Sequence, residues 1–108
     1  MRGKPVVPRA LARRDVEEAI DHYRREAGAG AAVGFVDSLE AAFALIGDHP
    51  AAGSPCSAHE LDLPGLRSIL LKRSPYLVFY VERDDHLDVW RVLHAHRDVP
   101  ARMRPPEV

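Results

Sequence analysis

Two β-rich runs near the end of the chain constrain its fold more than any other feature. They cover residues 76–81 and 87–93, and five mostly charged residues, 82–86, connect them. A connection this short between two strand-like runs predicts an antiparallel hairpin. The first run is apolar on both faces, with Leu77, Phe79 and Val81 on one and Tyr76, Val78 and Tyr80 on the other. We therefore expect this strand to lie in the centre of a sheet.

Two helices are predicted before the hairpin, over residues 10–27 and 31–46. In each segment, apolar residues recur at three- and four-residue intervals, which places them on one helix face. These residues are Ala12, Val16, Ala19, Ile20, Tyr23 and Ala27 in the first segment, and Ala32, Phe35, Val36, Leu39, Ala42, Phe43 and Ile46 in the second. Gly28 and Gly30 separate the segments, so we expect an αα-hairpin with both apolar stripes facing a common partner.

The remaining segments complete a sheet. Val6 and Val7 lie between prolines, which lack a backbone N–H, so they fit a short edge strand. Residues 50–64 are interrupted by Pro and Gly and are expected to be irregular, whereas residues 66–73 predict a further strand. The expected fold is α+β in the order β-α-α-β-β-β. The helical hairpin should pack on one face of a small, mostly antiparallel sheet.

Length and composition favour one soluble domain. The chain has 108 residues, with 46% hydrophobic and 29% charged, and we expect a single domain over 1–108 with a frayed tail at about 100–108. No apolar run approaches the roughly 20 residues of a membrane span, and no secretory signal opens the sequence. One cysteine, Cys56, cannot form an internal disulfide, which fits a reducing compartment. We therefore predict a cytoplasmic protein that does not bind membranes.

The segment after the second β-rich run carries two histidines in an H-x-H pair. Alternate residues of a strand share a face, so His94 and His96 could both reach one metal ion. No Cys or carboxylate is suitably spaced to supply the third and fourth ligands, so we predict no metal site and no cofactor. The alternative is that one histidine caps backbone groups where the strand ends and the other is exposed.

The same segment also contains the residue types of a metal-independent ribonuclease. His94 or His96 could act as acid or base, and Arg97 could stabilise phosphate charge, with Glu60 contributed by the preceding loop. The alternative is structural: Asp98 forms an ion pair with Arg97 or Arg91 and holds the chain where it leaves the sheet. Residue types alone favour the structural alternative.

Cationic residues lie on the predicted neighbouring strands: Arg67, Lys72, Arg73, Arg83 and Arg91. They could form a patch that contacts phosphates or an acidic protein, or they could simply be solvated. Trp90 and Tyr80 are expected to be structural residues of the sheet. Cys56 has no evident activating base nearby in the sequence, so we do not expect a thiol nucleophile.

Several motifs in order resemble the ParE-like toxins of type II toxin–antitoxin systems, within the RelE/ParE superfamily. The motifs are residues 8–18, 35–39, Ala42-Phe43, His49-Pro50 with Gly53, the stretch 61–68, residues 76–80, and the ending 92–98. The resemblance implies the same β-α-α-β-β-β fold. It also implies a toxin that forms a hetero-oligomer with a ParD-like antitoxin and meets DNA only through that antitoxin.

The resemblance leaves two activities open. ParE-type members are associated with inhibition of DNA gyrase by binding, whereas RelE-type relatives cleave mRNA on the ribosome. No tyrosine follows Tyr80, although catalytic relatives generally carry one near the C-terminus, and the net charge of −1 does not favour gripping RNA. Gyrase inhibition without catalysis is thus preferred, and an endoribonuclease using His94, His96 and Arg97 is the alternative.

Partner binding is expected on the helical hairpin and the edge of the sheet. Apolar surface there should contact the antitoxin, and cationic side chains should meet its acidic residues. The residues assigned to partner binding are Arg67, Lys72, Arg73, Arg91 and Arg97. Trp90, Tyr80 and Asp98 are assigned structural roles.

Overall fold

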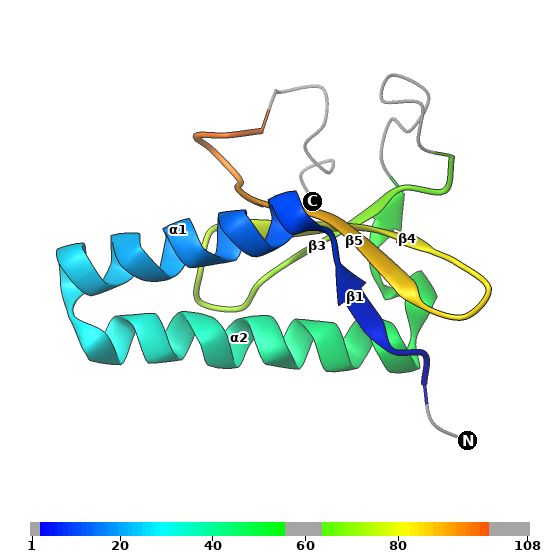
Figure 1. The fold of residues 1–108 in the computed structure, drawn as a ribbon, viewed down its shortest axis with the longest axis horizontal. Helices are drawn as coiled ribbons and strands as arrows, with labels where there is room; N and C mark the ends of the chain where they lie inside the picture. Colours follow the sequence, from blue (N-terminus) through cyan, green and yellow to red (C-terminus); the bar gives the residue numbers. More distant parts are fainter. Residues whose placement is uncertain (1–2, 56–63, 100–108) are drawn as a thin grey trace.

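The computed structural model describes residues 3–55 and 64–99, which form two helices against a five-stranded sheet (Figure 1). The elements are β1 (Val6–Pro8), α1 (Ala10–Ala27), α2 (Ala29–Asp48), the 3₁₀ turn η1 (Pro50–Ala52), β2 (Ser54–Pro55), β3 (Arg67–Leu70), β4 (Tyr76–Glu82) and β5 (Leu87–His94). This confirms the predicted α+β arrangement and adds a two-residue strand, β2, within the segment expected to be irregular. Cys56, Glu60 and the tail at 100–108 lie outside the described residues.

The strands lie in the order β1-β5-β4-β3-β2. β1 runs parallel to β5, and the other neighbouring strands are antiparallel. β4 is therefore central, as its two apolar faces predicted, and all of its residues except Glu82 are buried. β1 is an edge strand between Pro5 and Pro8, which also agrees with the prediction.

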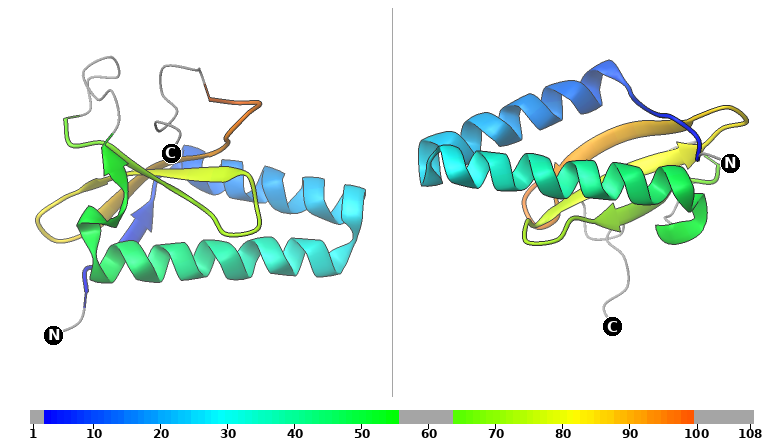
Figure 2. Two further views of the ribbon diagram at one scale, coloured as in Figure 1. Left: turned by 180° about the vertical axis from the view of Figure 1, so that it is seen from behind. Right: turned by 90° about the horizontal axis from the view of Figure 1, so that it is seen from below.

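Each face of the sheet has its own hydrophobic core. The helices lie side by side along one face (Figure 2), where Phe35 and Ile46 of α2 pack with Tyr76, Val78 and Tyr80 of β4. The intervening residues of β4 point to the opposite face. There Leu77, Phe79 and Val81 cluster with Leu66, Ala95 and Val99. Burial of each large side chain contributes about 1.5–3 kcal/mol, so both faces stabilise the central strand.

The connection between the helices is shorter than the sequence suggested. Gly28 alone separates α1 from α2, with a φ of 92° that side-chain-bearing residues rarely adopt. The predicted second break at Gly30 is wrong, because Gly30 lies inside α2. α2 also continues beyond Ile46 through Gly47 and Asp48, where the sequence had suggested its end.

α2 is more apolar than a typical surface helix. Its 20 residues are long and apolar enough to cross a membrane by length and composition alone. The sequence expectation that no segment approaches a membrane span overlooked this helix. In the structure α2 packs against α1 and the sheet through Phe35, Leu39 and Ile46, although only 28% of its most apolar stretch is buried.

Candidate functional site

A groove of about 540 Å³ lies between α2 and the outer part of β3, and we call it the α2–β3 groove. Small residues spaced along α2 form one wall: Ala31, Gly34, Ser38 and Ala41. Residues 69–71 form the other wall, and Asp37, Lys72 and Arg73 also line it. Small side chains on one wall let a bound chain approach the α2 backbone closely.

The groove is accessible because β3 is paired on its outer side over only two residues. β2 pairs with Arg67 and Ser68 and extends no further. The Leu71 amide donates to the Tyr76 carbonyl (2.9 Å), so alternation along the strand turns the backbone of Leu70 away from β4. Leu70 pairs with Leu77 of β4 on its inner side, and in the described part of the chain no strand pairs with its outer side. The backbone groups of Leu70 are therefore available, and exposed apolar surface at the groove comes from Leu45 of α2, whose side chain is 42% exposed.

Tyr80 holds the short β2 segment in place. Its buried hydroxyl donates to the Pro50 carbonyl (2.7 Å) and accepts from the Gly53 amide (2.8 Å). A Cβ at Gly53 would lie only 2.5 Å from that hydroxyl, so this position needs glycine. Trp90, the second residue assigned a structural role, packs edge-on against Phe79 with ring centroids 5.9 Å apart.

The five cations assigned to partner binding differ in their surroundings. Arg67 Nη1 donates to the Gly53 carbonyl (2.7 Å), which ties it to the loop before β2. Arg91 forms a bidentate pair with Asp15 of α1 (2.7 and 2.9 Å). Arg97 is placed near Asp98 and the Tyr76 hydroxyl at the end of β5. The structure brings only the remaining two, Lys72 and Arg73, to the α2–β3 groove.

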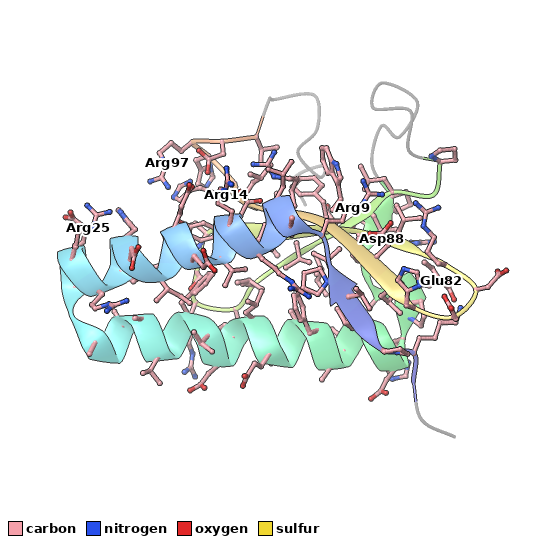
Figure 3. The ribbon with its side chains drawn as sticks, in the orientation of Figure 1. Arg9, Arg14, Arg25, Glu82, Asp88 and Arg97 are labelled. Atoms are coloured by element: carbon pink, nitrogen blue, oxygen red, sulfur yellow. The ribbon has the colours of Figure 1, made fainter. Side chains whose placement is uncertain are left out.

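Other charged residues fasten the helices to the sheet. Asp15 also accepts from the Val92 amide (3.0 Å), so a carboxylate of α1 covers part of the outer edge of β5. Figure 3 shows Arg9, at the start of α1, beside Asp88 of β5. Arg9 and Arg83 both donate to Asp88, and the hydrogen bond from Arg9 is the main cause that lowers the pKa of that carboxyl group. These contacts indicate structural roles.

The histidine segment forms a turn that caps itself. β5 ends at His94, and His96 lies in the turn that follows. The two imidazoles therefore do not occupy alternate positions of a strand, which the hypothesis of a shared metal ion had assumed. His94 Nδ1 accepts from the amides of His96 (3.2 Å) and Arg97 (3.1 Å), and Asp98 Oδ2 accepts from the His94 amide (3.1 Å). Burial, and then the Arg97 guanidinium, lowers the pKa of His94. Within residues 3–55 and 64–99, no group of three potential metal ligands occurs.

A tyrosine that the sequence analysis did not associate with this segment lies next to it. Tyr76 of β4 is opposite His94 in the strand register, their ring centroids are 5.3 Å apart, and Arg97 Nη2 is 3.4 Å from its hydroxyl. Burial raises the pKa of Tyr76, although the hydrogen bond from Arg97 opposes this. Tyr76 is only 4% exposed and borders a pocket of about 60 Å³. Typical small-molecule sites exceed about 300 Å³, so this pocket is smaller than most ligand sites.

The hairpin register was the signal that could have revealed Tyr76. β4 and β5 are joined by residues 82–86 and run antiparallel. The start of β4, at Tyr76, therefore lies beside the end of β5, at His94. No tyrosine follows Tyr80 in the sequence, so only the strand register brings one to this segment.

Comparison with known proteins places this arrangement in a family. Residues 6–99 match the sequence model described as the ParE toxin of the type II toxin–antitoxin system, parDE. The chain belongs to the ParE toxin family. A solved structure from the chromosomal ParDE TA system of P. aeruginosa resembles this ParE-family chain with a TM-score of 0.69 and 18% identity. The similarity covers 84% of this chain and 95% of that one, and it supports the fold. Comparison with curated protein sequences gave no match.

Proposed function

We propose that this ParE-family chain is a toxin that inhibits DNA gyrase by binding, and that a ParD-like antitoxin neutralises it by occupying the α2–β3 groove. The observation that carries the antitoxin site is the groove itself. It combines exposed Leu45, the unpaired outer edge of β3 at Leu70 within the described residues, and the cations Lys72 and Arg73. These features suit a partner segment with apolar and acidic side chains. Gyrase as the target rests on membership of the ParE family.

Non-catalytic action is supported by the geometry of the histidine segment. A general base needs a free ring nitrogen within reach of substrate, but His94 Nδ1 already accepts from two backbone amides. Tyr76 is only 4% exposed and borders a pocket of about 60 Å³, smaller than typical small-molecule sites. His96 and Arg97 are exposed and remain accessible.

The proximity of Tyr76, His94 and Arg97 favours an endoribonuclease as the second candidate. Such an enzyme should cleave transcripts on expression, and a folded His94→Ala/His96→Ala double variant should lose toxicity. Full toxicity of that variant with intact transcripts would exclude this candidate.

The gyrase proposal is tested by a supercoiling assay with purified toxin. We expect micromolar toxin to inhibit supercoiling and an equimolar amount of the adjacently encoded antitoxin to restore it. Unchanged supercoiling at micromolar excess would refute gyrase as the target.

A pair of substitutions tests the groove separately from the target. Leu45→Asp places a charge in the groove, whereas Val33→Asp places one elsewhere on the same helix, outside the groove lining, at another exposed apolar side chain (42% and 59%). We expect Leu45→Asp to remain toxic but resist neutralisation, and Val33→Asp to be neutralised normally. Equal neutralisation of both variants would place the antitoxin elsewhere.

A further inference from the structure

The turn between β3 and β4 holds an arginine in a backbone conformation that arginine disfavours. Arg73 has a φ of 65°, and it is the only non-glycine residue with positive φ in the described ranges. The left-handed region brings Cβ close to the following carbonyl oxygen, so glycine and asparagine occupy it more readily. A residue retained in such a conformation is a candidate for a role of its side chain.

The turn does not use the Arg73 side chain to keep its shape. Ser38 Oγ of α2 donates to the Lys72 carbonyl (2.8 Å), and the Leu71 amide donates to the Tyr76 carbonyl (2.9 Å). Ser74 is buried on the other side of the turn. Contacts on both sides of Arg73 therefore hold the backbone, and a residue without a long side chain would fit.

The Arg73 guanidinium makes no hydrogen bond or ion pair with any described residue, whereas several other arginines do. Arg9 and Arg91 each form a bidentate contact with a carboxylate, and Arg67 donates to a backbone carbonyl. Arg73 is exposed instead and lines the α2–β3 groove. Its exposed side chain thus belongs to the lining of the groove in which a partner would lie.

We propose that Arg73 is a specificity-determining contact that donates to a carboxylate of the antitoxin segment in the groove, an inference that rests on the proposed function. The planar guanidinium can bind a carboxylate through two parallel hydrogen bonds, which a lysine cannot do. Asp37, on the α2 wall, carries the opposite charge and disfavours an acidic side chain on that side. Together Asp37 and Arg73 orient the bound segment, with its carboxylate toward the β3–β4 turn.

The test compares Arg73→Gly, Arg73→Lys and the control Arg14→Ala, an exposed cation on α1 outside the groove. The adjacently encoded antitoxin, purified separately, is titrated into each toxin by calorimetry, and each toxin is melted alone. We expect Arg73→Gly to weaken binding roughly tenfold or more while its melting temperature is unchanged or higher. Arg73→Lys should lose less affinity, and Arg14→Ala should bind as the wild type does.

The outcomes separate the two proposals. Wild-type affinity in Arg73→Gly would overturn the role of Arg73 and leave the toxin–antitoxin function standing. A clear fall in the melting temperature of Arg73→Gly would also overturn it, because the residue would then serve the turn. No binding of antitoxin to the wild-type toxin would overturn the proposed function and this inference with it.

Discussion

Removal of one hydroxyl group, by Tyr80→Phe, should destabilise the protein strongly. The hydroxyl donates to the Pro50 carbonyl and accepts from the Gly53 amide, and Tyr80 has no exposed surface. The substitution leaves a buried amide and a carbonyl without this partner, and unsatisfied groups of this kind cost about 1–3 kcal/mol. We expect the free energy of unfolding to fall by about 2 kcal/mol, a large share of the 5–15 kcal/mol typical of a domain.

The assay is urea denaturation followed by circular dichroism, with Tyr76→Phe as the matched control. Tyr76 lies on the same face of the same strand, but its hydroxyl is 3.4 Å from the exposed Arg97 guanidinium, so its loss should cost less than about 0.5 kcal/mol. In a thermal melt, Tyr80→Phe should lower the midpoint by about 10 °C. Amide exchange at Gly53 should also speed up. Equal, small losses in the two variants would refute the role assigned to the Tyr80 hydroxyl.

Two further predictions concern the contacts that hold α1 and the end of β5. Asp15→Ala should lower the free energy of unfolding, measured by urea denaturation, by about 2–3 kcal/mol, because Arg91 and the Val92 amide lose their acceptor. The control is Asp21→Ala, which removes an exposed ion pair on the same helix. It should lower the free energy of unfolding by less than about 0.5 kcal/mol. The fold lowers the pKa of His94, so the neutral imidazole stabilises the protein. This contribution should be complete at pH values above the unfolded-state pKa of about 6.5, and it should be lost as the pH falls through the lower pKa of the folded state. Thermal melts across this range should show a weaker pH dependence for His94→Asn, whose side-chain oxygen accepts hydrogen bonds without titrating; identical pH profiles would contradict the capping role.

Local patterns predicted most of the fold. The three- and four-residue spacing in α1 and the two apolar faces of β4 depend only on neighbours in the chain, and both were confirmed. The end of α1 was also predicted correctly, but Gly28 alone could not be distinguished from Gly30 as the break. β2 escaped prediction because a side chain of another strand, Tyr80, holds the loop that precedes it.

The site was harder to predict because its contacts join residues far apart in the chain. In the sequence Arg91 resembles a surface cation, but in the structure it donates to Asp15, which is 76 positions away in the chain. Arg67 likewise resembled a partner-binding residue, but a carbonyl within the fold accepts from it. Residue type identifies a charge, whereas only the tertiary structure shows whether that charge is already used. Lys72 and Arg73 remain as candidates because the described structure leaves their side chains unbound.

The parallel pairing of β1 with β5 has a consequence for how the protein is made. Val6 pairs with Leu87, so β1 finds its partner only after β5 has been translated. Pairing at such a long sequence separation slows folding. A nascent or prematurely terminated chain that lacks β5 cannot complete the sheet. Translation itself therefore delays completion of the sheet until β5 has been synthesised.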